Sequence, residues 1–200
     1  MVMDTMSHWM KVVVLALGEL VFALVALPLY LFLVLPRQDG EGLPGFVPLI
    51  AEGVNPIVAV ALTVCALVAG IGLAIVLVRI FGRDSLITYE IDFLADGFSM
   101  FDLIPVYAAA GFAEEFLFRV VCVDLCGLVI SAILFTAAHF SYWKHPLLLA
   151  DIFAIALLFG GLYLFTQSLL LCALLHFAYN MAITHLVKSG FMTRVSRAQM

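Results

Sequence analysis

Charged residues are scarce in this chain of 200 residues. Asp, Glu, Lys and Arg make up 12% of it, against 66% hydrophobic residues, and the mean hydropathy is +1.21. Soluble domains carry about 25% charged residues, so this composition excludes an ordinary soluble protein. The nine Lys and Arg residues form no cluster, which argues against a nucleic-acid partner. We expect an all-α integral membrane protein that has the lipid bilayer as its surroundings.

Cysteines are few, and zinc-binding motifs are missing. Cys65, Cys122, Cys126 and Cys172 all lie within apolar runs, where small buried apolar residues are a better interpretation than disulfides or metal ligands. The chain contains no HExxH motif. It also lacks internal repeats. A transporter would be expected to contain paired inverted repeats, so their absence argues against that class of protein.

Long hydrophobic runs dominate instead. A bilayer core about 30 Å thick needs roughly 20 apolar residues in a helix. The first run is longer than the roughly 7–15 residues of a signal-peptide core, so we interpret it as a retained span. Tight loops between the last four runs predict antiparallel neighbours in one compact bundle. Six runs qualify as spans: Val12–Leu35, Pro56–Leu77, Leu103–Leu125, Leu128–Trp143, Leu147–Phe165 and Leu169–Val187.

The runs predict three parts of the chain. Residues 1–100 hold the first two spans, an irregular loop rich in Gly and Pro at 36–56, and an amphipathic surface segment after Arg79. Residues 101–188 hold the bundle of the last four spans, and residues 189–200 form a tail.

The positions of the cations predict the orientation. With the N-terminus inside, only Arg37 lies on the outer side, and Arg119 lies within the third span. Because cytoplasmic loops retain positive charge, both termini are predicted to lie in the cytoplasm. The seven cations on that side are Lys11, Arg79, Arg83, Lys144, Lys188, Arg194 and Arg197.

Three charges interrupt the third span, in the stretch GFAEEFLFRVV at 111–121. Each costs at least about 2.5–3.5 kcal/mol at mid-bilayer, so each needs compensation. Glu115 and Arg119 are four residues apart on one helical face, in the order that favours an ion pair. Glu114 lies about 100° away around the helix and should find its partners on another helix.

Neighbouring spans offer such partners. His139 lies in the fourth span, and His176 and Asn180 lie four residues apart on one face of the sixth. A carboxylate among apolar neighbours can act as a general base on water, while imidazole and amide N–H groups can stabilise an oxyanion. Two alternatives stay open at this point. Polar residues also hold membrane helices together, and one Glu with two His can bind zinc.

Two further acids lie alone in their spans. Asp151 is near the cytoplasmic end of the fifth span, where we expect it to be solvated. Glu19 in the first span is interpreted as a packing residue, and the sequence names no partner for it.

Three motifs occur in a fixed order: EExxxR at Glu114–Arg119, FxxxH at Phe135–His139 and HxxxN at His176–Asn180. Together they resemble the CPBP family of intramembrane proteases, also called the CAAX protease and bacteriocin-processing family, or Abi family. The resemblance covers about residues 101–188, which it identifies as a catalytic bundle. Many members have Gly where this chain has Val120, so local helix packing is expected to differ.

The resemblance implies a glutamate-dependent intramembrane endopeptidase that requires no metal, with zinc as the less favoured alternative. Glu114 would activate a water, His139 would assist it, and His176 with Asn180 would form the oxyanion hole. The site would be shaped by Glu115, Arg119 and Phe135.

Eukaryotic members of this family remove the last three residues of prenylated CAAX proteins. The short chain and its inward topology favour a bacterial inner-membrane protein, whose substrates would be membrane-associated peptides or proteins. The alternative is a non-catalytic membrane scaffold or bacteriocin-immunity protein of the same fold.

Overall fold

The structure, a computed structural model, describes residues 6–37 and 53–192. Within these ranges every regular element is a helix, and no strand occurs. Most of the predicted loop at 36–56 lies outside the described residues, and so do Arg194 and Arg197 of the predicted tail.

The first two predicted spans are helical, with one turn residue, Leu20, inside the first. Ser7 caps the first, since its Oγ accepts a hydrogen bond from the Met10 amide, and Asn55 caps α3 in the same way. The elements of the first span are α1 (His8–Glu19), α2 (Val21–Leu29), a π-helical turn η2 (Tyr30–Val34) and a 3₁₀ turn η3 (Leu35–Arg37), and α3 (Pro56–Phe81) is the second span.

A short helix closes one end of the bundle, where an amphipathic segment is predicted. It is α4 (Tyr89–Gly97), which follows the 3₁₀ turn η4 (Arg83–Ser85). The ammonium of Lys188, at the end of the last helix, donates hydrogen bonds to the carbonyl oxygens of Ala95 at 2.6 Å and Phe98 at 3.0 Å. These bonds fix α4 across the end of the bundle.

The third and fourth predicted spans are parts of one helical segment, Met100–Ala138. It consists of α5 (Met100–Glu115), the π-helix η5 (Phe116–Val123) and α6 (Asp124–Ala138). Gly127, with φ 81° and ψ 168°, turns the chain back inside α6, because this backbone region is open to glycine. The Ser131 hydroxyl donates to the Phe118 carbonyl, so the two arms lie side by side.

The returning arm is short. The helix ends at Ala138 and is followed by the 3₁₀ turn η6 (Phe140–Tyr142), so the predicted end of the fourth span at Trp143 is wrong. From Leu128 to Ala138 the helix rises about 16 Å, roughly half of a bilayer core. In the described part of the chain, five helical segments are long and apolar enough to cross a membrane, with the third and fourth predicted spans counted as one segment.

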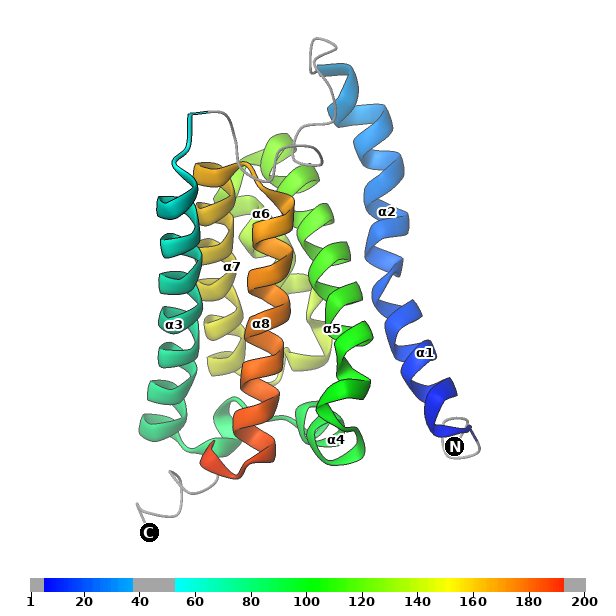
Figure 1. The fold of residues 1–200 in the computed structure, drawn as a ribbon, viewed down its shortest axis with the longest axis vertical. Helices are drawn as coiled ribbons and strands as arrows, with labels where there is room; N and C mark the ends of the chain where they lie inside the picture. Colours follow the sequence, from blue (N-terminus) through cyan, green and yellow to red (C-terminus); the bar gives the residue numbers. More distant parts are fainter. Residues whose placement is uncertain (1–5, 38–52, 193–200) are drawn as a thin grey trace.

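The last two helices confirm the predicted antiparallel pair. They are α7 (Pro146–Thr166) and α8 (Leu169–Lys188), joined only by Gln167 and Ser168. In Figure 1, α3 lies beside α7 and α8, while α5 lies on the other side of α8 and α1 packs outside α5. The bundle thus surrounds α8 with α3, α5 and α7.

A glycine lets α5 and α8 approach closely. A Cβ atom on Gly111 would lie 2.8 Å from the carbonyl oxygen of Ala173 and 3.3 Å from the Phe177 amide nitrogen. Backbone atoms cannot give way to a side chain as a flexible side-chain end can, so only glycine fits there. This contact sets Glu114 and Glu115, one turn further along α5, against the middle of α8.

The start of α1 and the end of α8 lie at the same end of the bundle (Figure 1). Arg79, in the last turn of α3, lies at this end too, whereas Arg37 lies at the opposite one. This arrangement separates the described cations as the sequence predicts. Which compartment each end faces stays a prediction.

We predict that this end is cytoplasmic, because it carries the excess of Lys and Arg. Reporter enzymes fused after Gly42 and after Lys188 should then lie on opposite sides of the membrane, the second one inside the cell. Both fusions on one side, or the reverse order, would contradict the prediction.

Candidate active site

A completely buried ion pair lies where α5 continues into η5. Glu115 and Arg119 both have 0% exposure. The guanidinium Nε donates to Glu115 Oε2 at 2.8 Å, and Nη2 approaches Oε1 at 3.4 Å. The ion pair predicted from the i,i+4 spacing is confirmed.

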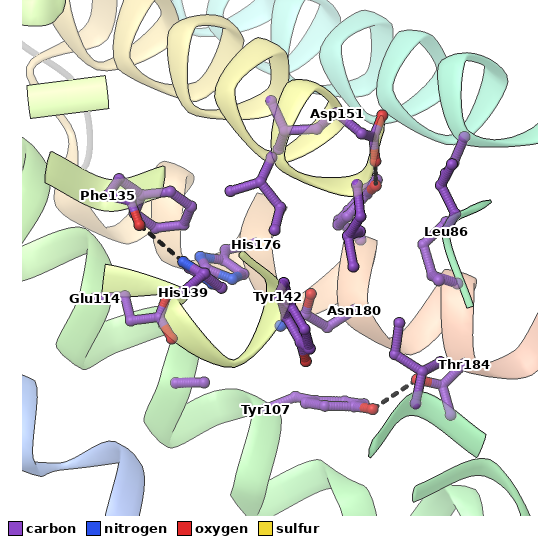
Figure 2. A pocket seen from close by; sticks show the side chains of 18 of the residues that line it. Leu86, Tyr107, Glu114, Phe135, His139, Tyr142, Asp151, His176, Asn180 and Thr184 are labelled. Atoms are coloured by element: carbon purple, nitrogen blue, oxygen red, sulfur yellow. Dashed lines mark hydrogen bonds between the residues drawn. The ribbon is translucent and has the colours of Figure 1, made fainter. Parts of the chain in front are cut away.

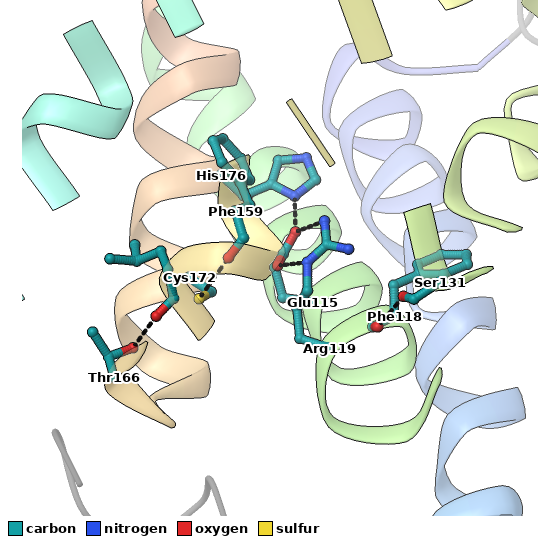
Figure 3. A network of polar contacts seen from close by, with 9 residues as sticks. Glu115, Phe118, Arg119, Ser131, Phe159, Thr166, Cys172 and His176 are labelled. Atoms are coloured by element: carbon teal, nitrogen blue, oxygen red, sulfur yellow. Dashed lines mark hydrogen bonds and ion pairs between the residues drawn. The ribbon is translucent and has the colours of Figure 1, made fainter. Parts of the chain in front are cut away.

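The same carboxylate also binds α8. His176 Nδ1 lies 2.9 Å from Glu115 Oε1, so Glu115 accepts hydrogen bonds from two cationic or polar groups on two helices (Figure 3). Sequence reasoning missed this contact, because it joins residues 61 positions apart and no local spacing reports it. The bond holds the imidazole in one orientation, with its second nitrogen directed away from Glu115 (Figure 3).

An aromatic ring covers the ion pair. The guanidinium carbon of Arg119 lies 5.1 Å from the centroid of the Phe135 ring, within the range of a cation–π interaction. The same ring meets the His176 ring edge-on at 6.1 Å. Phe135 therefore packs against both partners of Glu115.

The helix carrying Arg119 is wound as a π-helix, and Val120 lies buried within it. Such π-helical turns are frequent at functional sites. Ser131, on the returning arm of α6, donates its hydroxyl to the Phe118 carbonyl. This bond supplies a partner to the widened turn and connects it to the arm that carries Phe135.

A cavity of about 340 Å³ adjoins this cluster. The four predicted catalytic residues line it: Glu114 from α5, His139 after α6, and His176 and Asn180 from α8 (Figure 2). They come from three parts of the chain, so the fold brings these four residues together at one cavity.

Glu114 lines this cavity with one carboxylate oxygen that makes no hydrogen bond to the described residues. The residue is 7% exposed, and the buried oxygen is Oε2. The expected partners His176 and Asn180 on α8 line the same cavity, but within the described residues neither donates a hydrogen bond to this oxygen, because α5 turns it into the cavity. A buried, unsatisfied carboxylate oxygen is costly, and a water or a substrate group in the cavity can satisfy it.

His139 is held by the backbone. Its Nδ1 lies 2.8 Å from the carbonyl oxygen of Phe135. A carbonyl only accepts hydrogen bonds, so we assign the proton of the neutral ring to Nδ1. The other nitrogen, Nε2, is then a hydrogen-bond acceptor at the cavity wall.

Two lone acids of the sequence also line the cavity. Asp151 is 4% exposed and its Oδ2 accepts a hydrogen bond from the Tyr179 hydroxyl at 3.3 Å. The expectation that Asp151 is solvated is therefore wrong, because α3 and α8 cover this part of α7. Glu19, at the end of α1, lines the same cavity as Glu114. The sequence named no partner for Glu19, because the packing of α1 against α5 cannot be predicted from local residue spacing.

Within the described residues, no group of three or more His, Cys, Asp and Glu is arranged to hold a metal ion. The four cysteines are free thiols in the described structure.

We predict that Arg119→Ala destabilises the protein strongly. Removing one partner of a buried ion pair strands the other, which typically costs about 3–5 kcal/mol. Thermal unfolding in detergent measures the effect, and adding Glu115→Gln should recover part of it. Arg79→Ala, at an exposed position, is the control and should change stability by less than about 0.5 kcal/mol. Equal unfolding temperatures for the two variants would contradict the buried pair.

A family model described as type II CAAX prenyl endopeptidase Rce1-like matches residues 96–182, which include all three motifs. No curated protein and no solved structure matches the chain. With five long apolar helical segments among its described residues, the chain is an integral multi-pass membrane protein. Residues 96–182 belong to the CPBP family of intramembrane proteases, whose Rce1-like members are endopeptidases and hence hydrolases.

Proposed function

We propose that this protein is an intramembrane endopeptidase that hydrolyses peptide bonds of membrane-associated proteins or peptides with a water activated by Glu114. One observation carries the proposal. The buried carboxylate of Glu114 has an unpaired oxygen and shares a cavity with two imidazoles and an amide.

Glu114 is the general base in this proposal, and His139 is its helper. A water beside the unpaired Oε2 can donate one hydrogen to Glu114 and the other to His139 Nε2, which the Phe135 carbonyl leaves as an acceptor. Two acceptors orient the water oxygen so that a lone pair faces the substrate carbonyl.

His176 and Asn180 are the proposed oxyanion donors. Because His176 Nδ1 is bound to Glu115, its Nε2 donates a hydrogen bond only when the ring carries a second proton. Glu115 supports that imidazolium. The carboxylates of Glu114 and Glu115 then balance the two cations Arg119 and His176, so the buried group is neutral as a whole, as a low-dielectric site requires.

The site and its substrate together stay neutral during the proposed reaction. The water oxygen bonds to the carbonyl carbon while Glu114 takes the water proton, so the negative charge moves from Glu114 to the carbonyl oxygen. His176 and Asn180 stabilise that oxygen. When the intermediate collapses, the C–N bond breaks and Glu114 returns the proton to the leaving amine. No metal is used in this scheme, and zinc is the alternative that the test below addresses.

The proposed substrates are membrane-associated peptides or proteins in a bacterial inner membrane, with both termini of the protease in the cytoplasm. Peptide maturation, bacteriocin immunity and membrane-protein processing are roles of this kind. The family description names prenylated substrates, whereas our proposal for this chain requires only an apolar segment that enters the cavity from the bilayer.

We predict that the purified protein cleaves members of a quenched fluorescent peptide library and that Glu114→Gln abolishes the cleavage without lowering the folded yield. The change removes the base but keeps the side-chain shape. The matched control is Glu90→Gln, at an exposed position on α4, which should cleave like the wild type.

The contrary results are equally specific. No cleavage by wild-type protein would favour the scaffold or immunity protein. Full activity in Glu114→Gln would exclude Glu114 as the base. Loss of activity on chelation, with recovery on adding zinc and about one metal per chain by elemental analysis, would replace the metal-free mechanism by a zinc site.

A further inference from the structure

The cavity has a second wall that the proposed chemistry does not use. Asp151, in the second turn of α7, lines the cavity, and Figure 2 shows His176 between it and Glu114. Its Oδ2 accepts one hydrogen bond, from Tyr179, and its buried Oδ1 has no partner among the described residues. A carboxylate in this position still has room to accept donors from a bound molecule.

The charged groups that line the cavity are acids, apart from His176, which the proposed mechanism treats as an imidazolium bound to Glu115. The lining includes three carboxyl groups, those of Glu19, Glu114 and Asp151, and no Lys or Arg among the described residues. Arg119 lies outside this lining, bound to Glu115. A cavity of low dielectric lined by acids attracts positively charged groups.

Apolar side chains surround Asp151. Leu148, Ile152 and Ile155, from the same helix, also line the cavity. Lys and Arg side chains combine a long aliphatic stem with a cationic head, so the stem can pack on these residues while the head reaches the carboxylate. A small inorganic cation would leave the apolar wall unused.

We infer that Asp151 is a substrate-recognition residue that binds a Lys or Arg side chain of the peptide cleaved at Glu114. The inference rests on the proposed function and adds a substrate class to it. Since α7 begins at the end of the bundle where α8 finishes, Asp151 lies toward the predicted cytoplasmic end. Membrane proteins carry most of their Lys and Arg on that side. The substrate class is therefore an apolar segment with a basic residue at its cytoplasmic flank.

Binding and cleavage of matched peptides test this inference. An apolar fluorescent peptide is made with Lys, Gln or Glu at one position, and the position is moved stepwise along the peptide. Binding is read by fluorescence anisotropy in detergent, so it does not depend on turnover. At the preferred position, the wild-type protein should bind the Lys peptide about tenfold more tightly than the Gln peptide, as a charge-assisted hydrogen bond provides.

Four variants separate recognition from structure, and thermal unfolding checks that each is folded. Asp151→Asn should reduce the Lys-to-Gln ratio to about one, whereas Asp151→Glu should keep a preference. Tyr179→Phe removes the hydrogen bond seen here but leaves the carboxylate, so the preference should persist. Asp96→Asn removes an exposed acid on α4 and should leave the ratio at its wild-type value.

Each contrary outcome has its own meaning. Equal binding of Lys and Gln peptides by the wild type overturns the inference, while Glu114-dependent cleavage of both leaves the proposed function standing. A preference that survives Asp151→Asn, or that is lost equally in Tyr179→Phe, overturns the role of Asp151. Lys-selective binding without cleavage of any peptide overturns the protease proposal, and with it the statement that the bound peptide is a substrate.

Discussion

An ionised side chain inside an apolar bundle needs partners, and the rest of this site depends on how Glu115 finds two. It accepts hydrogen bonds from Arg119 on its own helix and from His176 on α8. The second bond crosses the bundle, and the close approach of the two helices at Gly111 makes it short enough to form. The neutralisation of Glu115 and the packing of α5 against α8 therefore depend on each other, so neither can change alone.

The two adjacent glutamates have different surroundings because they point in different directions from α5. Glu115 faces the interior of the protein, whereas Glu114 faces the cavity with an oxygen that has no partner among the described residues. A rotation of about 100° between successive residues produces this difference. The π-helix that follows accepts a hydrogen bond from Ser131 and places the Arg119 guanidinium against the Phe135 ring. In our account, the structural pair holds the imidazole so that the second carboxylate can act on water.

Local patterns allowed the sequence to predict much of this arrangement. The apolar runs predicted the helices, and the i,i+4 spacing predicted the Glu115–Arg119 pair, since both depend on neighbours along one helix. The bond from His176 to Glu115 and the burial of Asp151 depend on how separate helices dock, which no single run of residues reports. The turn at Gly127 lay between two apolar runs that were interpreted as full spans, although the second is too short to cross a bilayer core. The sequence named the motif residues, but only the fold shows which of the two glutamates contacts α8.

The orientation of His176 tests the central claim most directly. Nitrogen-15 NMR of protein with labelled histidine, in lipid, reports which ring nitrogens carry protons, and His176→Gln identifies the signal by its loss. If Glu115 holds the ring as described, Nδ1 of His176 is protonated and hydrogen-bonded in the wild type, and its resonance shifts in Glu115→Gln while that of His139 keeps its position. An unprotonated Nδ1, or a His176 signal indifferent to Glu115→Gln, would contradict the account.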